Sequence, residues 1–117
     1  MSKDRLSLLA IVESAGKIEK YTRNLADADE FYNDEQAFDA SMMNFIIIGE
    51  MTTRLSEEFK EEHNSIDWNK IKAFRNIAAH NYFGIDAEEV WQIIKNRIPE
   101  LKKSLIVILK KEFNEEL

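Results

Sequence analysis

The chain lacks cysteine altogether and has only one proline and three glycines among its 117 residues. Without cysteine, disulfide bonds and thiolate metal sites are excluded, which is compatible with a reducing cytoplasm. The scarcity of glycine and proline, with abundant Leu, Ile, Ala, Glu and Lys, favours long helices joined by few turns. No apolar run approaches the roughly 18 residues of a membrane span, and the charged first residues are unlike a signal peptide. We therefore expect a cytoplasmic protein that has no membrane association.

Acidic side chains outnumber basic ones, 22 to 16, and the formal net charge is −6 with a pI near 5.0. This balance argues against a protein that coats nucleic acid by bulk electrostatic attraction. From Trp68 to Ile85, however, the sequence has no Asp or Glu and carries Lys70, Lys72 and Arg75. Such a basic cluster concentrates anions locally even when the net charge is unfavourable.

The length and the 44% of hydrophobic residues predict one domain, residues 1–117, whose core needs no covalent or metal support. Apolar side chains that recur every three or four positions predict an all-α protein, an up-and-down bundle of four to five helices. The expected helices run from about Lys3 to Arg23, from about Glu35 to Phe59, from Trp68 until Gly84, from Ala87 to Arg97, and from Pro99 onward. Residues 27–34 are expected to form a loop, and Pro99 is expected to push Ile98 out of helical geometry.

The second predicted helix is apolar almost all round from Met42 to Ile48, so it should be covered on more than one side. A second copy of the chain is a natural cover. Gly49 costs this helix roughly 1 kcal/mol relative to Ala, which is usually explained by another backbone passing close. Glu50 is then either exposed or a buried carboxylate with a partner, and a structural role is favoured over a catalytic one.

The run from Arg75 to Tyr82 gathers a fixed cation, a proton shuttle and a phenol within eight residues. The planar fork of Arg fits phosphate oxygens, and His is the side chain that can take and give a proton near neutral pH. This combination suits phosphate chemistry, with Arg75 and His80 as the candidate catalytic residues. The alternative is structural: Arg75 would form a surface salt bridge, His80 would cap a helix end, and Tyr82 would be a core aromatic side chain.

Arg75 and His80 lie roughly 140° apart on an ideal helix, so one straight helix cannot aim both side chains at one phosphate. Either the helix unwinds around residues 79–81, or a second copy of the motif completes the site across a two-fold dimer. Asn76 precedes His80 by four residues and can share its helix face, so it is a candidate for orienting the imidazole.

The sequence has two histidines and no metal-binding pattern. Di-iron helical bundles use Glu-x-x-His pairs, but Ile77 stands three residues before His80, and Lys60 stands three residues before His63. Zinc patterns of the His-Glu-x-x-His kind and glycine-rich phosphate loops are absent too. We therefore expect no metal and no cofactor, and we expect His63 to be an exposed loop residue.

Residues 68–86, WNKIKAFRNIAAHNYFGID, resemble the signature of the HepT-like HEPN proteins, whose hallmark is Arg, four residues, His, one residue and Tyr. Comparable segments lie upstream at residues 46–50 and downstream at residues 90–94 and 98–99, so the resemblance covers most of the chain. It implies a HEPN-like fold and a homodimer with the site at its interface.

The resemblance further implies a ribonuclease toxin of a HEPN/MNT toxin-antitoxin pair that cleaves RNA through Arg75 and His80 without a metal. The expected partner is an MNT-type nucleotidyltransferase antitoxin, which transfers AMP from ATP to Tyr82 and could form a higher assembly with the toxin. The alternative function is a non-catalytic helical partner that regulates a nucleotidyltransferase, with the motif as a docking or nucleotide-binding surface.

Overall fold

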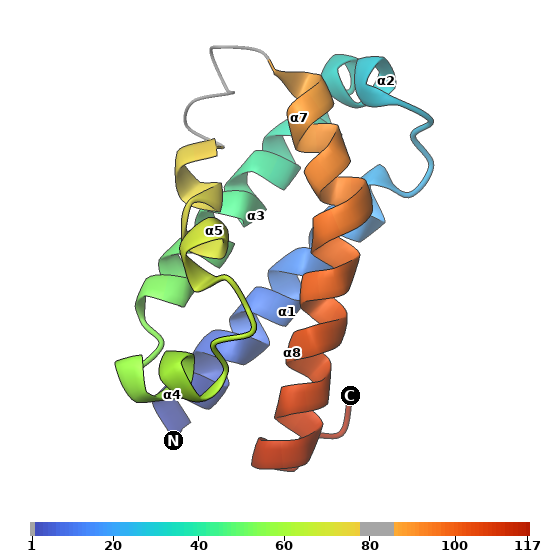
Figure 1. Ribbon diagram of the computed structural model, residues 1–117. Coiled ribbons are helices and arrows are strands. Elements are labelled where there is room, and N and C mark those ends of the chain that lie inside the picture. Colours follow the sequence, from blue (N-terminus) through green and yellow to red (C-terminus); the bar gives the residue numbers. More distant parts are fainter. Residues whose placement is uncertain (1, 78–85) are drawn as a thin grey trace.

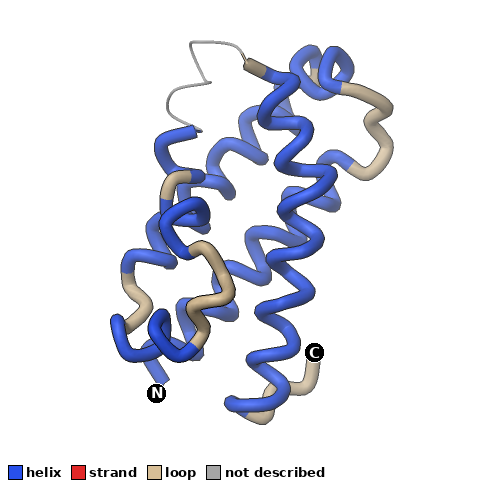
Figure 2. The backbone as a smooth tube through the Cα atoms, viewed as in Figure 1, coloured by secondary structure: helices blue, strands red, loops and turns tan. Residues whose placement is uncertain are grey.

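A computed structural model describes residues 2–77 and 86–117, and every regular element in these ranges is helical (Figure 1). The elements are α1 (Ser2–Thr22), α2 (Ala28–Asn33), α3 (Glu35–Thr53), α4 (Glu57–Glu62), α5 (Trp68–Lys72), α7 (Ala87–Gln92), the π-helix η1 (Ile93–Arg97) and α8 (Ile98–Phe113). Figure 2 shows these helices joined by short connections, with no strand in the described part of the chain. The predicted all-α fold is confirmed.

Three long helices form the frame of the bundle. The helix α1 runs away from the N-terminal end, α3 runs back toward it, and α7 through α8 again leads to that end (Figure 1). Both α3 and α8 pack against α1, while α5 packs against α3 and α2 packs against α7. This is the up-and-down arrangement that short connections favour.

One apolar core joins these helices. The largest fully buried apolar side chains come from five of the elements: Leu8, Ile11, Ile18, Phe31, Met42, Phe45, Ile48, Val90, Ile98, Leu105 and Leu109. Within α1, α3 and α8 they are three, four or seven residues apart, which gives each helix one buried face. Within the described residues, no helix is both long enough and apolar enough to cross a membrane.

The loop expected at residues 27–34 is wrong, because residues 28–33 form α2. The side chain of Asp27 caps this helix by accepting a hydrogen bond from the Glu30 N–H at 2.9 Å. The Phe31 side chain is fully buried, and its ring centroid lies 5.2 Å from that of Phe38 and 5.7 Å from that of Trp91. A helix of six residues is unstable in isolation, so these core contacts stabilise what the local sequence alone does not.

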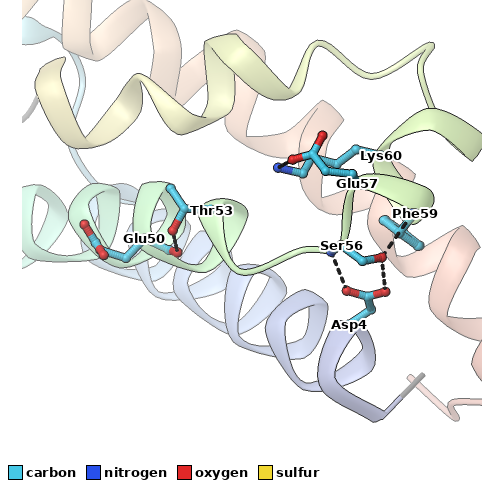
Figure 3. Close-up of polar contacts among 7 residues, drawn as sticks. All are labelled: Asp4, Glu50, Thr53, Ser56, Glu57, Phe59 and Lys60. Atoms are coloured by element: carbon cyan, nitrogen blue, oxygen red, sulfur yellow. Dashed lines mark hydrogen bonds and ion pairs between the residues drawn. The ribbon is translucent and has the colours of Figure 1, made fainter.

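The second predicted helix, Glu35 to Phe59, is divided in the structure. The helix α3 ends at Thr53, and α4 begins only after Ser56. The carboxylate of Asp4 in α1 accepts hydrogen bonds from the backbone N–H and the hydroxyl of Ser56, both at 2.8 Å (Figure 3). The Ser56 hydroxyl oxygen in turn accepts the Phe59 N–H at 3.1 Å and so caps α4. A residue 52 positions away therefore fixes the break.

The expectation that Pro99 displaces Ile98 from helical geometry is also wrong. Ile98 has φ −62° and ψ −47°, and the backbone stays helical from α7 through η1 into α8. The Ile98 N–H donates to the carbonyl of Ile93, five residues earlier, which is the bond of a π turn. Proline lacks an N–H, and its ring crowds the carbonyl four residues before it. The wider π turn accommodates both features without ending the helix.

Candidate active site

The segment that carries the motif begins at Asp67, whose side chain caps α5 by accepting the Lys70 N–H at 3.2 Å. The expected single helix from Trp68 to Gly84 is wrong within its described part, because α5 ends at Lys72 and Ala73 forms a turn. Residues 74–77 are helical again, and residues 78–85 lie outside the described residues.

The turn at Ala73 sets the direction of the chain at the motif. The Asn76 N–H donates to the Ala73 carbonyl at 2.9 Å, a bond three residues long that is tighter than the α-helical one. Phe74, which is 3% exposed, makes a T-shaped ring contact with Phe45 of α3, with the centroids 5.4 Å apart. Phe74 thus anchors this segment in the core, and the next residue, Arg75, is half-buried at the surface.

Gly49 of α3 lies against the start of the motif. A Cβ atom on Gly49 would be 2.7 Å from Arg75 Cβ, 2.9 Å from Arg75 N and 2.9 Å from the carbonyl oxygen of Lys72. Non-bonded heavy atoms prefer separations of about 3.5–4.0 Å, so any side chain here would push the two helical segments apart. The close backbone approach expected at Gly49 is confirmed.

The next residue of α3, Glu50, forms an ion pair with Arg75. The distance from Arg75 Nη1 to Glu50 Oε1 is 2.6 Å, and the two side chains are 37% and 43% exposed. Glu50 is therefore half-exposed and paired, between the two alternatives expected for it. A charge-assisted hydrogen bond of this kind fixes the guanidinium, which has five N–H donors, and leaves other donors for a ligand.

The described residues contain only part of the predicted site. Arg75 is brought together with Glu50, whereas Asn76 is exposed. Lys70 and Lys72 are exposed as well, so both can act on an approaching anion. His80 and Tyr82 lie outside the described residues.

The sequence did not reveal that Glu50 is the partner of Arg75. The sequence feature that could have indicated a partner is Gly49 followed by Glu50 at the end of an apolar run. A glycine within a helix indicates that another segment passes close by, and the side chain of the next residue can then reach the edge of that segment. Nothing in the spacing of the two residues, which are 25 positions apart, could name Arg75 as that neighbour.

The burial of His63 also differs from what the sequence predicted. His63 lies in the turn directly after α4, as the C-cap residue of that helix, but it is not exposed, because only 17% of its side chain is accessible. The cause is packing, since its ring lies 4.5 Å from the Phe59 ring, centroid to centroid, and its Nε2 lies 2.9 Å from Glu112 Oε2.

The fold and the site together define a class of protein. It is an all-α bundle in which a carboxylate of one helix, Glu50 of α3, pairs with an arginine of a neighbouring segment, Arg75, at a half-exposed position. The sequence pattern of the family described as ribonuclease HepT-like matches residues 11–108. The chain belongs to the ribonuclease HepT-like family.

Individual relatives agree with this assignment. A Methanocaldococcus jannaschii protein with the provisional name of an RNase is 33% identical over 101 residues, which are 86% of this chain and 92% of that protein. A Thermococcus cleftensis protein named as a probable ribonuclease HepT is 34% identical over 92 residues, 79% of this chain and 83% of that one.

A longer M. jannaschii protein is named for gamma-glutamylcyclotransferase activity and, provisionally, for RNase activity. It is 36% identical over 110 residues, 93% of this chain, and the match spans 49% of its own length. The chain thus corresponds to about half of this relative. No solved structure is a significant match to the chain.

Proposed function

We propose that the protein is a metal-independent endoribonuclease toxin of a toxin-antitoxin pair, in which Arg75 and His80 act on RNA at a two-fold dimer cleft. The observation that carries the proposal is the HepT-like match over residues 11–108, which includes the complete set of Arg75, His80 and Tyr82. The ribonuclease names of the relatives support the activity. The ion pair with Glu50 supports the role of Arg75, because a cation that is already oriented loses little further freedom when phosphate binds.

The proposed chemistry uses groups that RNA and the protein supply themselves. His80 removes the proton from a 2'-hydroxyl, whose oxygen forms a bond to the adjacent phosphorus. The bond from phosphorus to the 5'-oxygen breaks, and the His80 imidazolium returns a proton to that leaving oxygen. General acid-base catalysis of this type contributes typically about 10²–10⁴-fold in rate. Arg75 donates to the phosphoryl oxygens while negative charge develops on them. The products are a 2',3'-cyclic phosphate and a 5'-hydroxyl.

The surface of α3 supports a dimer next to this site. Met43, Ile46, Ile47 and Glu50 follow one another at intervals that place them on one helix face. The Met43 side chain is 58% exposed, and Ile46 and Ile47 are half-buried. This apolar face ends at Glu50, the partner of Arg75, so a second copy that covered it would bring its own motif close to the first.

The antitoxin half of the proposal rests on Tyr82. An MNT-type nucleotidyltransferase would transfer AMP from ATP to the phenol oxygen of Tyr82. The transferred group adds a phosphodiester with about one negative charge, together with a bulky nucleoside. That phosphate can pair with Arg75 and occupy the cation that RNA needs, while the adenosine obstructs the cleft.

A second candidate function is a non-catalytic regulator of a nucleotidyltransferase. The Arg75–Glu50 ion pair is compatible with this regulatory function, since a partly neutralised arginine also suits a docking surface. The acidic net charge of −6 points the same way.

RNA cleavage by the purified protein, with and without EDTA, separates the two. The ribonuclease proposal expects EDTA-resistant cleavage that leaves ends with 5'-hydroxyls, which polynucleotide kinase can label. Activity should be lost in His80→Ala and Arg75→Ala, and it should be poor in Arg75→Lys, because an ammonium keeps the charge but not the fork. The control is Arg23→Ala, which removes an exposed arginine outside the motif. Full activity in His80→Ala, or none in the wild type, would reject the proposal.

A further inference from the structure

Where the end of α4 lies next to the last turns of α8, an imidazole nitrogen and two carboxylates come close together. The distance from His63 Nε2 to Glu112 Oε2 is 2.9 Å, and one ligand atom each from Glu62, His63 and Glu112 lies within 4.8 Å of the other two. We propose that these three residues, here called the His63 site, bind a divalent transition-metal ion of the Zn²⁺ type. The inference does not depend on the proposed ribonuclease function.

The His63 nitrogen provides the first argument. Its Nε2 atom is buried, and among the described residues it has no hydrogen-bond partner of acceptable geometry, although Glu112 Oε2 is only 2.9 Å away. In a tetrahedral site the lone pair of each ligand atom points at the metal ion and not at the other ligand atom. A second ligand atom is therefore close to the first but off the axis of its lone pair. An oxygen that is close to Nε2 but poorly aligned as an acceptor is therefore in a position that suits a shared ion.

Ring packing holds the imidazole, and a hydrogen bond fixes the backbone that carries it, so the site has an oriented ligand. The ring packs on Phe59 at 4.5 Å between centroids. The carbonyl oxygen of His63 accepts a hydrogen bond from Trp68 Nε1 at 3.1 Å. Orientation of a metal-binding histidine by its surroundings raises metal affinity, because less freedom is lost on binding.

Electrostatics provides the second argument. Asp4, Glu58, Glu62 and Glu112 line a pocket of about 220 Å³, and in the described part of the chain this lining contains neither Lys nor Arg. Carboxylates that share a small volume repel one another, and a bound cation removes that repulsion.

Not all of the nearby carboxylates are free to bind a cation. Both oxygens of Asp4 already accept hydrogen bonds from Ser56, and Glu57 pairs with Lys60 at 3.4 Å (Figure 3). Glu62 is exposed and the Glu112 side chain is 39% exposed, so both can adjust by side-chain rotation. These two carboxylates are therefore the ones that complete the site with His63.

The donor set identifies the class of ion. An imidazole nitrogen with two carboxylates suits Zn²⁺ and its first-row neighbours, whereas Mg²⁺ and Ca²⁺ prefer oxygen ligands alone. Three protein ligands leave a fourth position of a tetrahedral ion for water. Since Glu62 and His63 end α4 and Glu112 lies near the end of α8, the ion would tie these two helices together.

Isothermal titration calorimetry on the untagged, EDTA-treated and dialysed protein tests the site with Zn²⁺, Co²⁺ and Mg²⁺. We expect one Zn²⁺ or Co²⁺ per chain, much weaker Mg²⁺ binding, and a rise in Tm of about 3–6 °C at saturating Zn²⁺. Glu112→Gln, which keeps size and shape, and His63→Ala should each weaken Zn²⁺ binding at least about tenfold and remove the Tm rise.

Two controls make the assignment specific. Glu61→Gln removes an exposed carboxylate beside the site, and His80→Ala removes the other histidine of the chain. Both should bind Zn²⁺ as the wild type does. The proposal is overturned if the wild type binds no Zn²⁺ at 100-fold excess over protein, or if neither Glu112→Gln nor His63→Ala weakens the binding. EDTA should lower the Tm without preventing RNA cleavage, so the two proposals can fail separately.

Discussion

The contact between Gly49 and the Arg75 segment can be tested by adding a single methyl group. In an ordinary helix, Gly→Ala stabilises the protein by about 0.8–1.0 kcal/mol, because Ala has the higher helix propensity. At Gly49 the new Cβ would lie 2.7 Å from Arg75 Cβ and 2.9 Å from two backbone atoms. Backbone cannot rotate away as a flexible side chain can, so the two segments must separate.

The magnitude follows from these opposing terms. Overpacking of a well-packed contact costs about 1–3 kcal/mol, and three contacts this short favour the upper half of that range. After subtraction of the propensity gain, we expect Gly49→Ala to lower the free energy of unfolding by about 1–2 kcal/mol. The displaced Arg75 should also lose its hydrogen bond to Glu50, so any activity that depends on Arg75 should fall further than stability does.

The chain contains a matched control in Gly16. This residue lies within α1, and a Cβ there would meet no heavy atom within 4 Å. Gly16→Ala should therefore raise the free energy of unfolding by about 0.5–1 kcal/mol. Urea unfolding followed by circular dichroism at 222 nm measures both variants, with the m-value as a check on the two-state assumption. A stabilisation of Gly49→Ala equal to that of Gly16→Ala would refute the proposed steric contact.

Three further predictions concern single side chains. Tyr82→Phe should keep much of the ribonuclease activity but escape silencing by an MNT-type partner with ATP; mass spectrometry should show AMP on the wild type, and equal silencing of the variant would reject Tyr82 as the switch. Asp4→Ala should lower the free energy of unfolding by about 1–3 kcal/mol in urea, because it leaves the Ser56 N–H without its partner, and an unchanged urea midpoint would contradict this. Glu50→Gln should keep kcat near the wild-type value and lower KM for RNA, since the amide oxygen can still accept a hydrogen bond from Arg75 while the negative charge is gone. Glu50→Ala should lower kcat, because Arg75 then loses this partner. Equal effects of the two substitutions on kcat and KM would reject a positioning role for Glu50.

Local signals in the sequence predicted the helices well wherever a helix is decided by its own residues. The buried stripe of α1 follows directly from the spacing of Leu8, Ile11 and Ile18, which are all fully buried. The predicted helix start at Trp68 is also local, because the side chain of the preceding Asp67 accepts the N–H of Lys70, three residues further on. Such features depend on neighbours in the chain, so they can be predicted without the fold.

The errors have the opposite origin. The break between α3 and α4 depends on Asp4, and α2 depends on the contact between Phe31 and Trp91, both of which join distant parts of the chain. The continuous helix across Pro99 depends on a π turn, for which local propensity rules give no signal. In each case a tertiary contact or an irregular backbone outweighed a local preference of comparable size.

In the candidate site, too, the features that depend on local sequence could be predicted and those that depend on tertiary contacts could not. Arg75, His80 and Tyr82 could be selected from the sequence because the family motif is a local pattern, and Asn76 could be selected from its four-residue spacing to His80. The pairing of Arg75 with Glu50 needed the fold.

That pairing bears on how an acidic protein could act on RNA. A carboxylate 2.6 Å from Arg75 orients the guanidinium but reduces the field that an approaching phosphate meets. In one chain, the exposed Lys70 and Lys72 must offset Glu50 as well as the net charge of −6. In the proposed dimer, two copies of the same basic cluster would face one cleft, and their potentials would add over distances shorter than the Debye length of about 8–10 Å. Dimerisation would then supply the electrostatic attraction that a single chain lacks, in addition to the second copy of the proposed catalytic motif.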